Sequence, residues 1–103
     1  VLTHPTNGII LSVKTCRDGG LILCGTVNLN NSQTVASNSA LYLLKLDADY
    51  NEIWSRVIPT QYQSYGMDVA ELSNGGYCLV GHQRTNNQIF NMLLIKTDPN
   101  GNY

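Results

Sequence analysis

Charged side chains are scarce in this sequence, and their signs are balanced. Only 13% of the 103 residues are charged, with six Lys and Arg against seven Asp and Glu and a net charge of −1. The basic residues are scattered along the chain. Binding to a nucleic-acid backbone or an anionic membrane normally needs clustered Lys and Arg, so neither partner is predicted.

Long apolar runs are missing as well. No stretch approaches the roughly 18–20 apolar residues of a membrane span, and the first residues lack the basic-then-apolar layout of a signal peptide. Uncharged polar residues are abundant instead, since Asn, Gln, Ser and Thr number 32 and outnumber the charged residues by more than two to one. A length of 103 residues fits one domain at most, and the composition favours an extracellular β protein.

The patterns that catalysis needs are also absent. There is no G-x-S-x-G segment, and neither His4 nor His82 has an evident Ser or Cys partner. The carboxylates lie mostly in predicted turns, without an acid–base pair. Cys16, Cys24 and Cys78 form no C-x-x-C pair and no zinc-ligand spacing, so buried structural thiols are expected. We therefore predict a protein that is not an enzyme, with no catalytic residue and no cofactor.

One segment has part of a calcium-loop pattern. Residues 47–51 place side-chain oxygens at alternate positions, as the first half of such a loop does. The sixth position of a calcium loop is Gly and the twelfth is Glu, whereas here they are Glu52 and Ile58. The corresponding segment 98–102 is rich in Pro, Asn and Gly, which is typical of a turn. No metal site is predicted.

An internal repeat organises the chain. Residues 18–25 (Asp-Gly-Gly-Leu-Ile-Leu-Cys-Gly) align with residues 74–81 (Asn-Gly-Gly-Tyr-Cys-Leu-Val-Gly) at an offset of 56. Residues 43–51 align with residues 94–102 at an offset of 51, and the loops between the two blocks absorb the difference. A repeat of this length matches a propeller blade and exceeds the ankyrin and tetratricopeptide units.

Each repeat is predicted to form four strands. The expected strands are residues 9–16, 21–27, 41–46 and 52–58, then 66–72, 77–82 and 91–97. The Asp18-Gly19 pair predicts a type I′ hairpin turn. Residues 21–24 and 92–95 are apolar at every position, which predicts burial on both faces of the sheet. Because no helical periodicity is present, stacked four-stranded sheets are the expected cover, as in a β-propeller.

These segments resemble the repeats of β-propellers in secreted and cell-surface bacterial proteins, often from Bacteroidota. The resemblance rests on Asp/Asn-Gly-Gly before an apolar run and Gly, on Lys-x-Asp-x-x-x-Asn, and on Ile53-Trp54-Ser55. It covers nearly the whole chain and recurs twice. It implies an all-β fold of two four-stranded antiparallel blades, the last outer strand truncated, in a secreted or cell-surface protein.

The segment before Trp54 is also similar to the tryptophan-bearing turn of quinoprotein-type propeller repeats. That similarity implies that Trp54 clamps adjacent blades. Those repeats usually carry Gly shortly before the Trp, where this copy has Tyr50-Asn51-Glu52. A quinone-dependent dehydrogenase would rest on this turn alone, because no cofactor-binding residues can be placed.

The repeat register also divides the chain. Residues 1–58 are predicted to hold the end of a preceding outer strand and a first blade, and residues 59–103 an incomplete second blade. Propellers close with 4–8 blades, and two isolated blades would leave apolar faces and open edges exposed. The expected partners are therefore other blades, supplied by the same polypeptide or by further copies of the chain.

The predicted topology gathers the long connections at one end of the strands, opposite the tight turns. Loops on a rigid scaffold commonly carry binding groups. This end combines aromatic, amide and guanidinium side chains, which suit a protein or glycan surface. The candidate binding residues are Tyr62, Tyr65, Arg84, Gln88 and Phe90.

The sequence therefore predicts a non-catalytic interaction scaffold that binds a protein partner through the long-loop face. An alternative from another class is a carbohydrate-binding lectin formed by oligomerised two-blade protomers. A lectin would stack sugars on aromatic rings, and Trp54 is the only Trp in the sequence.

Overall fold

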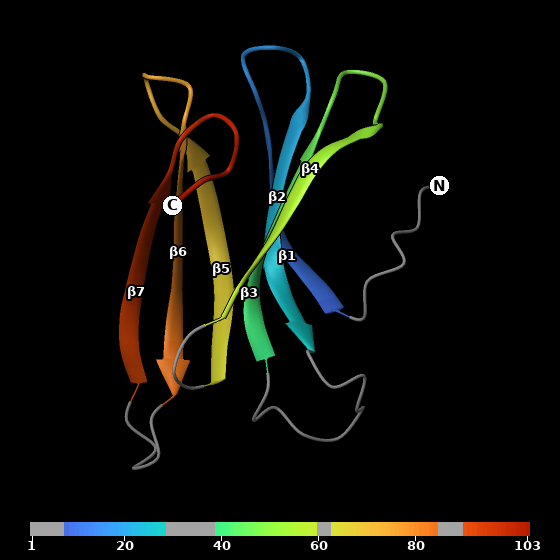
Figure 1. Cartoon of the computed structure of the whole chain (residues 1–103). Coiled ribbons are helices and arrows are strands. Elements are labelled where there is room, and N and C mark those ends of the chain that lie inside the picture. The colour runs from blue at the N-terminus through green and yellow to red at the C-terminus, as the bar shows by residue number, and fades with distance from the viewer. Residues whose placement is uncertain (1–7, 29–38, 60–62, 85–89) are drawn as a thin grey trace.

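The computed structural model describes residues 8–28, 39–59, 63–84 and 90–103 (Figure 1). These residues form two antiparallel sheets, and no helix occurs among them. Sheet A has the order β1(Gly8–Thr15), β2(Leu21–Asn28), β3(Ser39–Leu46), β4(Glu52–Ile58). Sheet B has the order β5(Gln63–Glu71), β6(Tyr77–Arg84), β7(Phe90–Thr97). The protein is all-β, and the parts of the chain described form no closed ring.

The two sheets share a backbone irregularity at the same place in the repeat. The pairing of β1 with β2 shifts between Ile10 and Ser12, which leaves Leu11 as a bulge. The pairing of β5 with β6 shifts between Gly66 and Asp68, 56 residues later, which leaves Met67 as a bulge. A bulge redirects the side chains that follow it, so β1 and β5 change direction at equivalent points.

Four tight turns have the same geometry. In the first, the Gly19 amide donates to the Cys16 carbonyl and the Cys16 amide donates to the Gly20 carbonyl. The same two bonds close the turns at residues 47–51, 72–76 and 98–102. The fourth residue of each turn has positive φ, namely Gly19 (87°), Tyr50 (68°), Gly75 (87°) and Gly101 (82°).

This geometry is the three-residue hairpin loop in which a type I turn precedes a left-handed residue. The type I′ turn predicted from Asp18-Gly19 is therefore wrong. A type I′ turn needs positive φ at both central residues, and Asp18 is not among the described residues with positive φ. The type I′ turn would have placed Cys24 opposite Val13, whereas the longer loop shifts the register and Cys24 lies opposite Ser12.

The main core lies between the sheets. Strand β5 packs on β2 and β3 and also contacts β1. Sheet A contributes Ile22, Cys24, Leu41 and Leu43, each 0% exposed, and sheet B contributes Val69, Tyr77 and Leu79, each almost fully buried. Full burial of one large apolar side chain is worth about 1.5–3 kcal/mol, so this layer is the main source of cohesion between the sheets.

Burial differs sharply between equivalent strands. Every residue of β3 is buried, and a second apolar cluster lies on the face of sheet A turned away from sheet B. Strand β7, the counterpart of β3, is mostly exposed, with Met92 at 93% and Leu94 at 67%. The predicted burial of residues 92–95 on both faces is therefore wrong for this chain, because no described element covers the outer face of sheet B.

Candidate functional site

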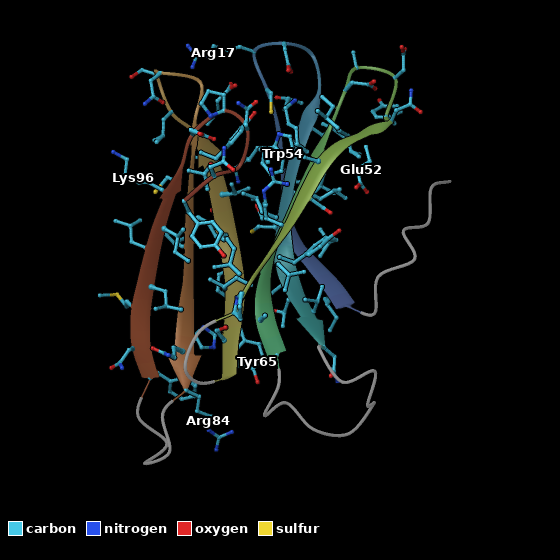
Figure 2. The ribbon with its side chains drawn as sticks, viewed as in Figure 1. Arg17, Glu52, Trp54, Tyr65, Arg84 and Lys96 are labelled. Atoms are coloured by element: carbon cyan, nitrogen blue, oxygen red, sulfur yellow. The ribbon has the colours of Figure 1, made fainter. Side chains whose placement is uncertain are left out.

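The two ends of the fold have different connections. The four tight turns gather at one end, and the strand ends next to the long connections lie at the other (Figure 1). Tyr65 and Arg84 lie at the long-connection end, opposite Arg17 (Figure 2). Of the other candidates, Phe90 begins β7 at this end, whereas Tyr62 and Gln88 lie outside the described residues.

Three rings come together at this end of sheet B. Tyr65 of β5 and His82 of β6 are cross-strand partners, and their ring centroids lie 4.9 Å apart. The Phe90 ring meets the His82 ring edge-on at 5.3 Å. Arg84 is the cross-strand partner of Phe90. We call Tyr65, His82, Phe90 and Arg84 the ring patch.

The ring patch lies on the face of sheet B that is turned away from sheet A. Successive side chains of a strand point to opposite faces. Leu79 is buried against sheet A, so Val80 and His82 lie on the other face, together with their cross-strand neighbours. Phe90 is 61% exposed, and the other three members of the patch are partly exposed. A partner can therefore reach the patch through Phe90 and the rims of its neighbours.

His82 is the member that sequence reasoning undervalued. Its place at the end of a predicted strand, without a Ser or Cys partner, predicts an ordinary satisfied or solvent-facing histidine. Its actual neighbours are aromatic, because Gly66 pairs with Gly81 and this register places Tyr65 opposite His82. The feature that brings these rings together is the pairing register of β5 and β6, which a catalytic motif does not contain.

Sheet A has the smaller Thr26 and Ser39 where sheet B has His82 and Phe90, and there the sheets approach closely. The Gly66 amide donates to the Thr26 hydroxyl at 3.3 Å, and the Ser64 hydroxyl donates to the Ser39 carbonyl at 3.5 Å. A Cβ on Gly66 would lie 2.6 Å from the Gly25 carbonyl oxygen. Thr26 and Ser39 correspond to His82 and Phe90, so this end of sheet A packs closely where sheet B projects rings.

Charged contacts join β1 of sheet A to β5 of sheet B. The Asp68 carboxylate accepts from the Ser12 hydroxyl at 2.6 Å and pairs with the Lys14 ammonium at 2.9 Å. The Ser12 hydrogen bond, followed by that of Lys14, lowers the pKa of Asp68 to about 2. All these groups are exposed, so each contributes modestly to stability.

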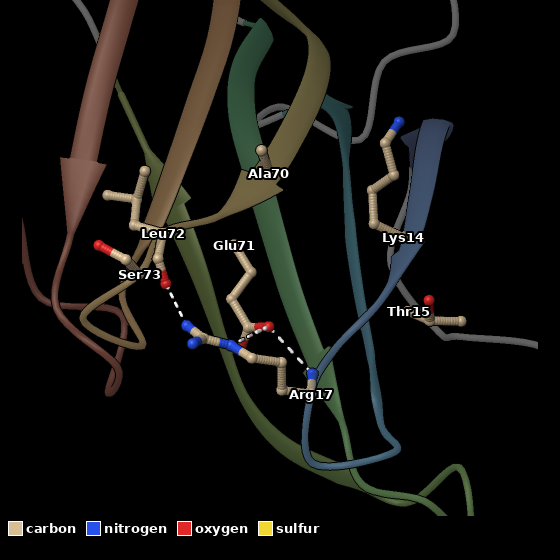
Figure 3. A pocket seen from close by; sticks show the side chains of 7 residues that line it. All are labelled: Lys14, Thr15, Arg17, Ala70, Glu71, Leu72 and Ser73. Carbon is tan, nitrogen blue, oxygen red and sulfur yellow. Dashed lines mark hydrogen bonds and ion pairs between the residues drawn. The ribbon is translucent and has the colours of Figure 1, made fainter.

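A second contact of this kind borders an open cleft of about 460 Å³ (Figure 3). The Glu71 carboxylate accepts from the Arg17 amide at 2.9 Å and from Arg17 Nε at 3.3 Å, and the Arg17 guanidinium also donates to the Leu72 carbonyl. The cleft is lined by Lys14, Thr15, Arg17, Ala70, Glu71, Leu72 and Ser73. Its cations already face acids of sheet B, so these contacts hold the sheets together and offer no unpaired charge to a ligand.

Trp54 lies where β4 meets a turn of sheet B. Its ring is T-shaped to Tyr77 at 5.8 Å, and a Cβ on Gly101 would lie 2.8 Å from Trp54 Cζ3. The Arg56 guanidinium lies 5.2 Å from the Trp54 ring centroid and donates to the Asn100 carbonyl at 2.7 Å. Trp54 therefore packs across the boundary between the sheets, whereas Tyr65, Arg84 and Phe90 lie at the other end.

Asp47 and the cysteines, the other candidates for chemistry, have structural surroundings in the described residues. The Asp47 carboxylate accepts from the amides of Asp49 and Asn51 at 2.8 and 2.9 Å, which closes its turn. Over the described ranges, no three His, Cys, Asp or Glu side chains are grouped to hold a metal ion. The three cysteines are free thiols, and Cys16 and Cys24 are buried as predicted, whereas Cys78 is only partly buried. Burial raises the pKa of Cys24 to about 11. No helix in those ranges is long and apolar enough to cross a membrane.

The chain matches no protein-family model, no curated protein and no solved structure with which it was compared. Its function must therefore be argued from its own residues.

Proposed function

We propose that this chain is a non-catalytic interaction module of propeller-type repeats, in a secreted or cell-surface protein, that binds a protein partner through the ring patch. One observation carries this proposal. Where sheet A has Thr26 and Ser39 packed closely against a neighbouring sheet, sheet B has His82 and Phe90 in a cluster of rings that faces solvent. Side chains of this size at these positions prevent the same close packing and provide a contact surface.

Propeller-type packing is supported by features that recur in both repeats. The bulges, the turns and the two offsets agree between the sheets, and the sheets stack face to face over one apolar layer. Stacking of successive sheets on such layers is how propeller blades bury both of their faces.

The composition of the ring patch favours a protein partner. Aromatic residues and Arg are enriched at protein interfaces and dominate their binding energy. The lectin alternative relied on Trp54, whose ring packs on Tyr77 and Gly101. A lectin could therefore stack a sugar on Tyr65 or Phe90 in place of Trp54.

The test is capture by the immobilised chain from the extracellular protein fraction of the source cells, with a glycan array run in parallel. The variant Tyr65→Ala/Arg84→Ala/Phe90→Ala removes most of the ring patch. The matched control is Tyr50→Asn, which removes an exposed ring at the other end and keeps a residue type that tolerates positive φ.

We expect the wild-type chain and the control to retain the same protein, and the triple variant to retain at least about tenfold less, because truncated interface anchors typically cost 2 kcal/mol or more. Equal capture by all three proteins contradicts the proposal. Glycan binding that depends on the same three residues, without protein capture, replaces it with the lectin alternative.

A further inference from the structure

The contact between the sheets has two different halves. One half is the face of sheet A that carries Ile22, Cys24, Leu41 and Leu43, all fully buried. The other half is formed mainly by strand β5, which packs across β2 and β3 and buries Val69, together with the buried Tyr77 and Leu79 of β6. Because the halves differ, a copy of the same contact can be made only head to tail.

The repeat places a second example of the first half on sheet B. The positions of Ile22, Cys24, Leu41 and Leu43 correspond to Cys78, Val80, Met92 and Leu94. The pairing confirms the correspondence, because Cys24 lies opposite Leu43 in sheet A and Val80 lies opposite Leu94 in sheet B. Val80, Met92 and Leu94 lie on the outer face of sheet B around an apolar hollow of about 570 Å³, which Met67, Gly81 and Leu93 also line.

The repeat also places a second example of the other half on strand β1. Val13 corresponds to the buried Val69, and the Leu11 bulge corresponds to the Met67 bulge. Ser12 and Lys14 reach Asp68 of sheet B, so Val13 between them lies on the opposite face. Ile10 pairs with Gly25 on the same face as Val13, and both Ile10 and Val13 are exposed. An apolar strip therefore lies uncovered at the end of the stack opposite the hollow.

The geometry points to head-to-tail association of the chain, in which the β1 strip of one copy packs into the sheet B hollow of a second copy. This docking rests on the repeat packing of the proposed function and extends the interface already present between β5 and sheet A. A head-to-tail contact leaves one free half at each end of the pair, so further copies add until a ring closes or an open chain forms.

The new contact is apolar, unlike the one inside the chain. The acids Asp68 and Glu71, which meet Lys14 and Arg17, correspond to Ser12 and Thr15. The two cations correspond to Ala70 and Ser73. Neither ion pair is repeated, so the association should respond little to added sodium chloride.

The new contact also leaves the ring patch open. Inside the chain, Gly66 lies so close to Gly25 that a Cβ on Gly66 would clash. In the new contact the equivalent residue is Ile10, which has a large side chain. The β1 strip therefore cannot approach Gly81 as closely at the long-connection end. The docked area is limited to the half nearer the tight turns, away from Tyr65 and Phe90.

The test is sedimentation of the wild-type chain and two variants over a concentration series. Val13→Asp places a charge on the β1 strip, and Leu94→Asp places one in the hollow. We expect the wild type to grow beyond 11.3 kDa with concentration and each variant alone to associate at least about tenfold more weakly, because burying an unpaired charge is costly. An equimolar mixture of the two variants should form a heterodimer and nothing larger, since only one intact pair of halves remains.

Three results overturn this docking. They are a wild type that stays monomeric at every concentration, a Val13→Asp protein that associates as well as the wild type, and a mixture of the two variants that does not pair. Tyr103→Asp, at an exposed ring outside both surfaces, is the control and should behave as the wild type does. Circular dichroism checks that the variants are folded, and Met92→Lys replaces Leu94→Asp if that protein is unfolded. A monomeric wild type leaves the ring-patch capture experiment unaffected.

Discussion

Sheets A and B are built from the same repeat, yet equivalent residues meet different surroundings. Leu43 in β3 is fully buried against sheet B, whereas its counterpart Leu94 in β7 is 67% exposed. Pairing and turn geometry are the same in both sheets. The repeat therefore determines which face of a strand is apolar, and the neighbouring sheet determines whether that face is buried.

The largest expected difference between the sheets is in the cost of removing an apolar side chain. Leu43→Ala should lower the free energy of unfolding by about 2–5 kcal/mol, the usual cost of a cavity at a buried Leu. Leu94→Ala should change it by less than about 0.5 kcal/mol, because the side chain is mostly in water. Urea unfolding of both variants at a concentration where the chain is monomeric makes the comparison, and equal costs would contradict the assigned packing.

The second comparison concerns the left-handed residues of two equivalent turns. Gly101→Ala should destabilise by roughly 1–3 kcal/mol, because φ is 82° and the new Cβ would meet Trp54. Tyr50→Gly should change stability by less than about 1 kcal/mol, because relief of the strain at φ 68° offsets the added freedom of the unfolded chain. Thermal unfolding measures both variants. A harmless Gly101→Ala would mean that Trp54 does not pack on this turn.

The third comparison uses a charge that differs between the repeats. The Lys45 ammonium is buried and pairs with the partly exposed Asp18 carboxylate at 3.0 Å. The corresponding pair is Lys96 and Asn74, with Lys96 exposed. Asp18→Asn keeps the oxygen that accepts from the Gly20 amide, as Asn74 does for Gly76. The variant therefore isolates the charge.

We expect Asp18→Asn to cost about 1–2 kcal/mol, less than a fully buried pair because the carboxylate is hydrated. Asn74→Asp should change stability by less than about 0.5 kcal/mol, since a surface pair is worth little. Chemical unfolding of both variants tests this, and an equal effect of the two would show that burial of Lys45 is not what matters.

The smallest effect concerns acid. The folded-state pKa of Asp68 is about 2, below its ordinary value of 3.8, owing first to Ser12 and then to Lys14. The stabilisation is therefore present above about pH 4 and is lost as the pH falls through 4 toward 2. Asp68→Asn removes this contribution. The stability of the variant should fall less steeply than that of the wild type over that range, and parallel acid profiles would count against the contact.

Much of the backbone could be predicted from the sequence. The repeat and the Gly, Asp and Asn residues predicted where the four turns and the neighbouring strands lie. These residues favour turns through their own backbone conformation and short-range hydrogen bonds, so their effect can be seen in the sequence. The turn type and the bulges were not predicted, since both depend on how two strands pair. The strand bounds shifted for the same reason, and β5 begins at Gln63 where residue 66 was expected.

The candidate site was harder to predict. Tyr65, Arg84 and Phe90 lie near the same end because topology fixes the ends of strands. His82 joins them through a cross-strand register that a motif search does not consider. Burial of residues 92–95 was overestimated. An apolar run shows that a strand can pack on both faces, but it does not show whether a neighbouring element covers each face.

The central claim is that one face of the repeat is buried in sheet A and open in sheet B, and the native thiols test it most directly. Cys24 lies in the buried layer, and Cys78 alternates with the buried Leu79 and so lies on the outer face of sheet B. Burial raises the pKa of Cys24 from 9.0 to about 11, which lowers its thiolate fraction about a hundredfold at neutral pH. With a thiol reagent on the native monomer, we predict rapid labelling of Cys78 and at least about hundredfold slower labelling of Cys24. Equal rates at the two positions would contradict the account.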